Sequence, residues 1–287
     1  MKPSENITWL SSYPKSGNTW FRTILSNLRA AKQANPVNIN ELRFECLNSA
    51  SRDSFENILG INASELPRDT VDQLRVKLFK YWPTKATERL FIKTHDLFRH
   101  LPSGESLFED EVMHSVLYFI RNPLDIVASF ANHEVLSFDE IIDFMLDKNA
   151  VFSNNELKGH KQVSQFFSSW DQHVQSWNNA TPKVLCLKYE DMISQPENTF
   201  GRALTHIKLD FDDALIREAI AKSAFQLLSQ QEEESGFLEK KPSSPFFFRK
   251  GMAGGWREEL TNSQAQRIID EFGATMEILG YPTSLTG

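Results

Sequence analysis

Four short apolar segments, separated by stretches with helical spacing, constrain the fold of this chain more than any other feature. They span residues 7–13, 90–93, 115–120 and 184–187. Short apolar runs that do not alternate with polar residues are typical of strands buried on both faces of a sheet. Strands that are separated by helices usually pair in parallel. The sequence therefore predicts an α/β fold with a central, mainly parallel sheet flanked by helices.

Helical patterns lie between and after these strands. Residues 38–80 indicate irregular helix with breaks at Gly60 and Pro67, and residues 229–256 indicate a long loop that is polar, then rich in Phe, then rich in Gly. The sequence shows neither an internal repeat nor a linker, so we expect a single domain over residues 1–287. The other predicted helices are 18–29, 124–132, 137–148, 160–178, helical segments from 188 to about 228, and 262–279.

The balance of charge excludes one large class of function. The 287 residues include 31 Lys and Arg against 38 Asp and Glu, which gives a formal net charge of −7. A general nucleic-acid binder normally carries a basic excess, so we expect no nucleic-acid partner. The acidic excess is concentrated in residues 101–160, where Arg121 is the only arginine.

Cysteine content and the first residues bear on the compartment. Cys46 and Cys186 cannot build a disulfide framework, which favours a reducing compartment. The apolar run 7–10 is too short for the core of a signal peptide. No stretch of the sequence approaches the about 20 apolar residues of a membrane helix. We therefore expect a cytoplasmic protein with no membrane partner.

A loop of small residues joins the first predicted strand to the first predicted helix. Backbone N–H groups of small residues can converge on an anion, and the N-terminus of the following helix adds its dipole. Lys15 can reach into the same cradle as a point charge. The alternative is a plain strand-to-helix turn with an exposed lysine. The residues concerned are Lys15, Ser16, Gly17, Asn18, Thr19 and Trp20.

The string Tyr-Pro-Lys-Ser-Gly-Asn-Thr-Trp at residues 13–20 resembles the 5′-phosphosulfate loop of the sulfotransferases. The usual family form has Thr where this chain has Asn18. The resemblance implies a P-loop-like phosphosulfate loop, in which Lys15 to Trp20 bind the donor 3′-phosphoadenosine 5′-phosphosulfate (PAPS). It also implies that Trp20 offers one face to the adenine of this donor.

A second signature follows the predicted strand 115–120. The tripeptide Arg-Asn-Pro begins at Arg121, and Ser129 lies eight positions after the arginine, as in the family. A guanidinium at a strand end gives fork-shaped recognition of a phosphate, and a hydroxyl in the next helix can add a second donor. The resemblance implies that Arg121 and Ser129 hold the 3′-phosphate of PAPS. The alternative is a surface pair of Arg121 with Asp125, which would contribute little.

A third signature lies at residues 248–256, which resemble the family's Arg-Lys-Gly-x-x-Gly-Asp-Trp loop over the 3′-phosphate. Arg249 and Lys250 stand next to Gly251, and adjacent cations beside glycines suit a mobile phosphate clamp. Gly255 replaces the usual Asp, which leaves the geometry of this turn open.

Three shorter matches also occur in the order in which the family's motifs follow one another along the chain. Lys93 and His95 belong to a Lys-Thr-His string after the second predicted strand, and the family's histidine there is the general base. Tyr189 begins a Tyr-Glu-Asp string whose tyrosine contacts adenine in the family. Ser223 and Phe225 stand where the family has Thr-Ser-Phe, and its Phe stacks on adenine.

The resemblance implies sulfuryl transfer from PAPS to a small-molecule acceptor by in-line attack at sulfur. We expect His95 to act as the base, because histidine alone has an unperturbed pKa near neutrality. Lys15 is expected to stabilise the leaving oxygen, and Lys93 to contact the sulfuryl oxygens. No metal-ligand spacing is visible in the sequence, and we expect no metal. The acceptor atom, a hydroxyl oxygen or an amine or carbamate nitrogen, stays open.

Two alternatives from other classes of function stay open. The loop of a nucleotide kinase or NTPase ends in Gly-Lys-Ser/Thr, whereas Lys15 precedes Gly17 here. A non-catalytic nucleotide-binding module would not need His95. The family's dimer motif is not reproduced, because Asn262 follows Thr261, and the oligomeric state stays open.

Two further expectations concern residues outside these motifs. Trp170 and Trp177 are expected in the core rather than on an acceptor platform. Glu232, Glu233 and Glu234 are expected to form a solvated face of a loop.

Overall fold

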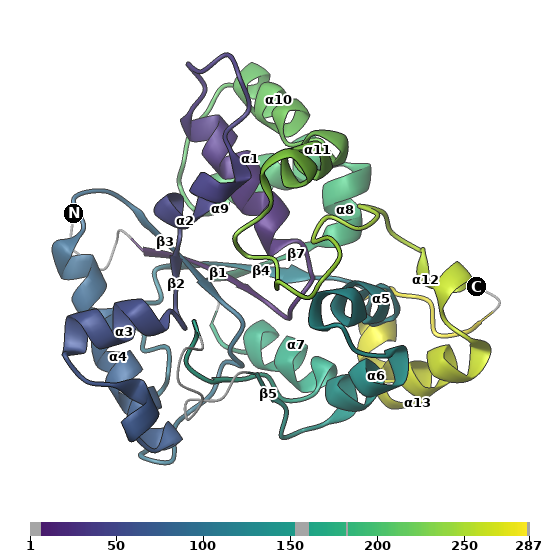
Figure 1. Ribbon diagram of the computed structural model, residues 1–287, viewed down its shortest axis with the longest axis horizontal. Helices are drawn as coiled ribbons and strands as arrows, with labels where there is room; N and C mark the ends of the chain where they lie inside the picture. Colours follow the sequence, from purple (N-terminus) through teal and green to yellow (C-terminus); the bar gives the residue numbers. More distant parts are fainter. Residues whose placement is uncertain (1–6, 153–160, 182, 286–287) are drawn as a thin grey trace. The chain divides into compact units, whose positions relative to one another are not determined.

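The computed structural model describes residues 7–152, 161–181 and 183–285 (Figure 1). Residue 160, where a helix was expected to begin, lies outside these residues. The chain forms two compact units, each assembled from three separate stretches. The first unit comprises Met1–Tyr13, Cys46–Tyr118 and Lys148–Cys186. The second unit comprises Pro14–Glu45, Phe119–Asp147 and Leu187–Gly287.

A five-stranded parallel sheet organises the chain. Its strands are β1 (Ile7–Ser12), β2 (Leu47–Asn48), β3 (Leu90–Thr94), β4 (Ser115–Ile120) and β7 (Val184–Lys188). They lie in the order β2-β3-β1-β4-β7, and the register of β1 with β3 runs from Ile7 opposite Leu90 to Ser11 opposite Thr94. All four predicted strands are present, so the predicted α/β class is confirmed. The two residues of β2 are too few to stand out as an apolar run.

The strands β1 and β4 both lead directly into a loop that opens a helix. After β1, Gly17 caps the helix α1 (Asn18–Arg29) with a φ of 101°, in the left-handed region. After β4, Asn122 caps the helix α5 (Pro123–Glu134) by accepting a hydrogen bond from the N–H of Leu124. A proline suits the first position of α5, because the first N–H groups of a helix have no partner within it. Both helices begin within one residue of the predicted start.

The remaining helices divide between the two units. The predicted breaks at Gly60 and Pro67 are confirmed, since one helix ends and another begins beside them. The first unit contains α3 (Arg52–Leu59), the 3-10 turn η3 (Ala63–Glu65), α4 (Arg68–Lys85) and α7 (Trp170–Asn178). The second unit contains the 3-10 turn η2 (Ile39–Glu41), α2 (Leu42–Glu45), α6 (Phe138–Leu146), α8 (Tyr189–Ser194), α9 (Pro196–His206), α10 (Asp213–Lys222), α11 (Phe225–Ser235), α12 (Trp256–Glu259) and α13 (Asn262–Ile278).

The helix predicted over residues 160–178 is wrong in its first half. Only α7 is helical, and Gln165–Phe166 forms a short strand, β6, antiparallel to β5 (Val151–Phe152). The cause is a competing tertiary contact, because the N–H of Phe167 bonds to the carbonyl of Ala150 rather than to a preceding helical turn.

The loop predicted over residues 229–256 begins later than the sequence indicates. The helix α11 extends to Ser235, and Glu232 within it is only 8% exposed. The prediction of a solvated loop face at Glu232 is therefore wrong. The reason is that the Glu232 carboxylate accepts hydrogen bonds from the backbone N–H groups of Phe247 and Phe248.

The two tryptophans of α7 lie in the core, as predicted. Trp170 and Trp177 are both fully buried. Every residue of β1 and β4 is buried as well. A strand that is covered on both faces has no solvent-exposed position, so no position favours a polar side chain. This explains the apolar runs in the sequence.

A buried ion-pair network in the first unit holds the chain just beyond β3. Arg75 on α4 is fully buried and bonds to both carboxylate oxygens of Asp96, at 3.1 and 2.5 Å. It also bonds to Asp72 at 3.1 Å. Burial raises the pKa of Asp96, but the charge of Arg75 outweighs this effect, so the pKa lies below its usual value. The network fixes the residue that follows His95 in the chain.

The substitution Arg75→Leu should lower the free energy of unfolding by about 3–5 kcal/mol, because it leaves the buried carboxylate of Asp96 without the cation that bonds to both its oxygens. Arg68→Leu is a matched control on the same helix, since the Arg68 side chain is 38% exposed and lies 4.0 Å from Asp72. Its loss should cost about 1 kcal/mol or less. Urea unfolding followed by tryptophan fluorescence measures both, and equal losses in the two variants would contradict the assignment.

Candidate functional site

The loop after β1 has a backbone that few residues tolerate. Lys15 and Gly17 both lie in the left-handed region, with φ of 65° and 101°. A Cβ atom added at Gly17 would lie 2.8 Å from Cδ2 of Tyr189, which is closer than real Cβ contacts come. Glycine is therefore required at this position both by its φ and by the space available.

Ser16 lies inside this loop with a buried hydroxyl. Its side chain is 1% exposed, and among the described residues its Oγ has no hydrogen-bond partner. A buried polar atom of this kind costs free energy unless water or a ligand satisfies it. The helix α1 begins at Asn18 without a side-chain cap, so its first N–H groups can serve the same ligand. The loop fits an anion such as a phosphate group.

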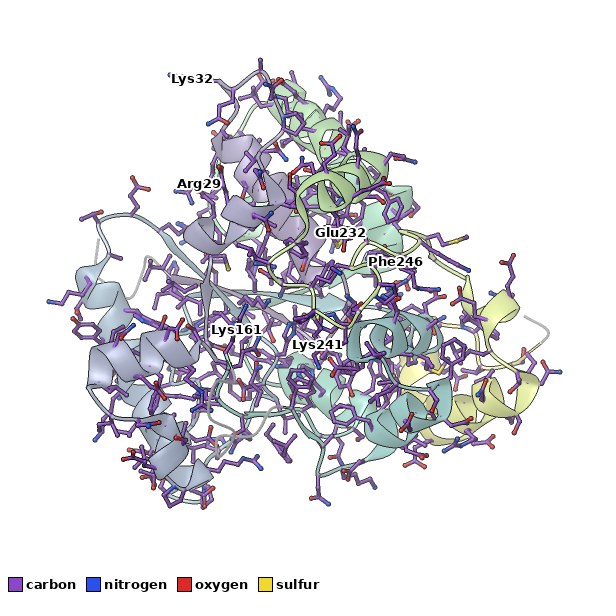
Figure 2. All side chains as sticks on the ribbon, in the orientation of Figure 1. Arg29, Lys32, Lys161, Glu232, Lys241 and Phe246 are labelled. Atoms are coloured by element: carbon purple, nitrogen blue, oxygen red, sulfur yellow. The ribbon has the colours of Figure 1, made fainter. Side chains whose placement is uncertain are left out.

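The ammonium of Lys15 lies over the ring of Phe247, with Nζ 3.6 Å from the ring centroid. This is a cation–π contact. The backbone N–H groups of Phe247 and Phe248 lie 2.6 and 2.9 Å from the two carboxylate oxygens of Glu232. Figure 2 labels Glu232 and Phe246, the residue before Phe247. The carboxylate thus anchors the aromatic segment on which the lysine rests.

Arg121 ties the loop after β1 to the glycine-rich loop. Its guanidinium donates to the carbonyl oxygens of Lys15, at 3.0 Å, and of Met252, at 3.1 Å. The guanidinium carbon lies 4.3 Å from the centroid of the Tyr189 ring. The Nε atom is buried and has no partner among the described residues. Ser129, the other predicted 3′-phosphate residue, is half-buried on α5.

Asp125 binds the glycine-rich loop. Its carboxylate accepts hydrogen bonds from the N–H groups of Gly254, at 2.8 Å, and Trp256, at 3.0 Å. Since Asp125 is buried, the alternative of a surface pair with Arg121 is wrong. Gly255 has φ of −65° and ψ of −16°, which any residue adopts. The absence of the usual Asp at this position therefore leaves an ordinary helical turn.

The two cations of the predicted phosphate clamp pair with one carboxylate. The guanidinium of Arg249 lies 2.6 and 2.8 Å from the two oxygens of Glu259, and the ammonium of Lys250 pairs with the same group. Beside them, Gly251 has a φ of 62°, and a Cβ there would lie 2.6 Å from Cγ of Phe225. Glycine is therefore required here as well, and Phe225 packs directly against the loop.

The residues predicted to contact adenine lie together in the second unit. Trp20 donates from its indole nitrogen to the carbonyl of Ser223 at 2.9 Å, and its ring meets Tyr189 edge-on with 6.0 Å between centroids. The Ser223 hydroxyl is buried, donates to the carbonyl of Ala219 and accepts from the Asn27 amide. Ser223 thus holds Trp20 in place, while its contact with the donor stays a prediction.

His95 follows β3 in the first unit, and its neighbours set its tautomer. Nδ1 lies 2.8 Å from the carbonyl oxygen of Ser12, the last residue of β1. A carbonyl oxygen only accepts, so in the neutral ring Nδ1 carries the hydrogen and Nε2 carries the lone pair. The backbone N–H of His95 donates to the Gln165 side chain at 3.3 Å. The ring therefore has Nε2 as its basic atom.

Sequence reasoning does not identify His173, a fully buried residue of α7. Its Nε2 lies 3.1 Å from the carbonyl oxygen of His95, and its Nδ1 lies 2.8 Å from the hydroxyl of Tyr118. Burial lowers the pKa of His173 to about 4, so it is neutral near pH 7. No local motif marks this residue, because its partners lie 78 and 55 positions away in the sequence.

The predicted site residues divide between the two units. Lys93 is a half-buried residue of β3 and belongs to the first unit with His95. Lys15, Arg121 and the clamp cations belong to the second unit, as do all the other residues predicted to bind the donor. Apart from Lys93, which is expected to contact the sulfuryl oxygens, the predicted donor contacts are therefore gathered within one unit.

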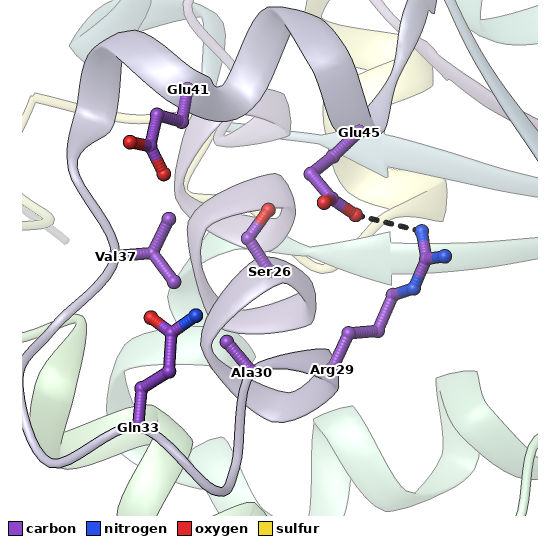
Figure 3. A pocket seen from close by; sticks show the side chains of 7 residues that line it. All are labelled: Ser26, Arg29, Ala30, Gln33, Val37, Glu41 and Glu45. Atoms are coloured by element: carbon purple, nitrogen blue, oxygen red, sulfur yellow. Dashed lines mark hydrogen bonds and ion pairs between the residues drawn. The ribbon is translucent and has the colours of Figure 1, made fainter.

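A pocket in the second unit has a different lining (Figure 3). Its volume is about 310 Å³. An ion pair of 2.7 Å joins two of its lining residues, Arg29 and Glu45. The lining consists of Ser26, Arg29, Ala30, Gln33, Val37, Glu41 and Glu45, and none of these is a predicted site residue.

The described residues lack both a cluster of metal ligands and a helix that could span a membrane. In that part of the chain, there is no group of three or more His, Cys, Asp or Glu side chains that could hold a metal ion. Of the helices formed by the same residues, none combines the length and the apolar character needed to cross a membrane.

Comparison with known proteins leads to the same family as the motifs. The family described as "Sulfotransferase domain" matches residues 5–280. Sulfotransferase 1 family member D1 of Mus musculus is 24% identical over 284 residues, which cover 93% of this chain and 82% of the mouse protein. Flavonol 3-sulfotransferase of Flaveria bidentis is 24% identical over 300 residues, which cover 97% of this chain and 85% of the plant protein.

Solved structures share the fold. The crystal structure of mouse sulfotransferase SULT7A1 complexed with PAP has a TM-score of 0.61 at 17% identity, and the match covers 95% of this chain and 85% of that one. Retinol dehydratase in a complex with retinol and PAP has a TM-score of 0.61 at 17% identity, with 96% and 82% covered. The family match over residues 5–280, which agrees with the motifs along the chain, shows that this protein belongs to the sulfotransferase family and is a PAPS-dependent enzyme.

Proposed function

We propose that this enzyme transfers the sulfuryl group of PAPS to a hydroxyl oxygen, or to an amine or carbamate nitrogen, of a small-molecule acceptor. The anion cradle after β1 carries the proposal. It combines the buried, unpartnered hydroxyl of Ser16 with the left-handed Gly17 and the uncapped start of α1. The PAP held by the two similar solved structures, which is the desulfated donor 3′,5′-phosphoadenosine, supports the same donor.

The donor carries a phosphate at each end of its ribose, and the second unit has a separate set of residues for each. In this proposal the 5′-phosphosulfate lies in the loop of Lys15, Ser16, Gly17, Asn18, Thr19 and Trp20. The 3′-phosphate is held by Arg121, Ser129, Arg249, Lys250 and Gly251. The adenine lies against Trp20, Tyr189 and Phe225, with Ser223 supporting the tryptophan.

His95 is the base in this proposal. As the acceptor atom forms its bond to sulfur, the bond between sulfur and the 5′-phosphate oxygen breaks, and Nε2 of His95 takes the proton of the acceptor. The hydrogen bond from Nδ1 to the carbonyl of Ser12 supports this role, because it orients the ring and stabilises the imidazolium that forms. His173 holds the backbone carbonyl of His95 from its buried position.

Lys15 stabilises the charge that develops on the leaving phosphate oxygen, and Lys93 contacts the sulfuryl oxygens. The contact of Lys15 with Phe247 supports its role. A cation–π contact is weaker than an ion pair with a phosphate, so the ammonium can exchange the ring for the donor.

We also propose that residues 1–287 work as one sulfotransferase domain in the cytoplasm. The family match extends across stretches of both units, which supports a single functional domain. Cytosolic sulfotransferase 15 of Arabidopsis thaliana is 24% identical over 277 residues, which supports the compartment. Names of relatives such as flavonol 3-sulfotransferase support a small-molecule acceptor.

Lys15→Met should reduce kcat by about 100-fold or more, because it removes the cation that neutralises the leaving oxygen. Lys32→Met is the matched control, since Lys32 is an exposed lysine of the same unit (Figure 2) and should leave kcat unchanged. Transfer of labelled sulfate from PAPS measures both variants. A Lys15→Met enzyme as active as the control would exclude this role for Lys15.

His95→Ala should lower kcat by about 100- to 10,000-fold, which is the usual contribution of a general base. Its affinity for PAP, measured by calorimetry, should stay within about twofold of the wild-type value, because no donor contact is assigned to His95. His100→Ala, at an exposed histidine of the same unit, should match the wild type in both measurements. Near-normal turnover in the His95→Ala enzyme would overturn the base assignment.

Incubation of the enzyme with PAPS and a cell metabolite extract should yield products heavier by one sulfo group, detected by mass spectrometry. The reaction should persist in EDTA, since lysines and backbone N–H groups supply the positive charge here. Transfer that stops in EDTA would favour a phosphate-loop kinase or NTPase. Tight binding of PAP without any sulfated product would favour a non-catalytic binding module.

A further inference from the structure

Glu259 is the last residue of α12, just beyond the glycine-rich loop, and it faces both clamp cations. Its two oxygens lie 2.6 and 2.8 Å from the terminal guanidinium nitrogens of Arg249. The ammonium of Lys250 pairs with the same carboxylate. The Glu259 side chain is only 12% exposed. The two cations assigned to the 3′-phosphate therefore already have an anionic partner within the chain.

This carboxylate uses the hydrogen-bond donors that a phosphate would use. A guanidinium binds a carboxylate and a phosphate through the same planar pair of N–H groups. Burial raises the pKa of Glu259, but its bonds to Arg249 and Lys250 outweigh this effect, so the pKa lies below its usual value and the group is ionised at neutral pH. Nε of Arg249 is buried and has no partner among the described residues, so the carboxylate leaves part of the guanidinium unsatisfied.

Contacts other than those of Glu259 hold the backbone of the glycine-rich loop. Asp125 holds the backbone at Gly254 and Trp256, and Gly251 packs against Phe225. Beyond Glu259 the chain leaves the single turn of α12 and becomes extended. None of these contacts involves the Glu259 carboxylate, so an exchange of its partners breaks none of them.

We propose that Glu259 lowers the affinity of this enzyme for its donor and for PAP by competing with the 3′-phosphate for Arg249 and Lys250. The inference rests on the proposed function and deepens it. Binding of the 3′-phosphate requires the carboxylate to release the guanidinium, which reduces the fraction of enzyme that is ready to bind. A bound phosphate then lies close to a carboxylate of like charge, which weakens binding further. When PAP leaves, the carboxylate takes its place on the two cations.

The substitution Glu259→Gln removes this charge and keeps the shape of the side chain. Glu258→Gln is the matched control, because Glu258 is the exposed neighbour of Glu259 on α12. Calorimetry gives the dissociation constants of wild type and both variants for PAP and for AMP, which lacks the 3′-phosphate. We expect Glu259→Gln to bind PAP about tenfold more tightly than wild type, the effect of one charged hydrogen-bonded pair. Its affinity for AMP should not change, and Glu258→Gln should match wild type for both ligands.

Three other outcomes would each overturn the inference, and each has a different physical cause. Weaker binding of PAP by Glu259→Gln would show that Glu259 orients the clamp instead of competing for it. Equal tightening in the Glu258 and Glu259 variants would show an effect of net charge alone. A wild type that binds PAP no more tightly than AMP would overturn the proposed donor site itself, and this result is distinct because it needs no variant.

Discussion

The arrangement of two loops in the second unit depends on Arg121. Its guanidinium donates hydrogen bonds to the backbone carbonyls of Lys15 and Met252. The two loops concerned are more than a hundred residues apart in sequence, and each has a glycine with positive φ. Because the acceptors belong to the main chain, the guanidinium fixes the paths of the loops, and not only their side chains. Tyr189 packs against the same guanidinium and against Gly17, which leaves no space for a side chain there. The arginine that we propose as a ligand of the 3′-phosphate thus also shapes two loops of the second unit.

In the proposed donor site, the cations around this contact offset locally the net charge of −7 that the whole chain carries. A few focused charges matter more for a small ligand than the sign of the whole surface. In the described residues, these cations already have partners within the chain: Phe247 lies under Lys15, and Arg249 and Lys250 share Glu259. In our proposal the donor has to replace Glu259 on Arg249 and Lys250, and this exchange lowers the affinity for the donor.

Much of the fold followed from local patterns. The strands β1 and β4 are buried on both faces, so their apolar runs identify them without any knowledge of their neighbours. The helix α1 also has the predicted bounds. Prediction failed at β6, where the backbone of Phe167 bonds to a distant carbonyl, and at Glu232, whose carboxylate binds backbone N–H groups 15 and 16 positions away. Neither partner can be inferred from a local pattern.

The α/β class, the family and the candidate charged and titratable residues of the site could all be predicted from the amino-acid sequence. The fold class follows from the apolar runs, and the family from the resemblance of short contiguous strings, such as residues 13–20, to family motifs. The atoms through which the site residues make contacts, and the side chains that pair with them, became visible in the folded chain. The carbonyl of Ser12 selects Nε2 as the basic atom of His95, the buried His173 holds His95 by its backbone, and Glu259 occupies the phosphate clamp. Each of these effects arises from a contact between residues that folding brings together. Such a contact cannot be predicted from a short contiguous segment of the sequence.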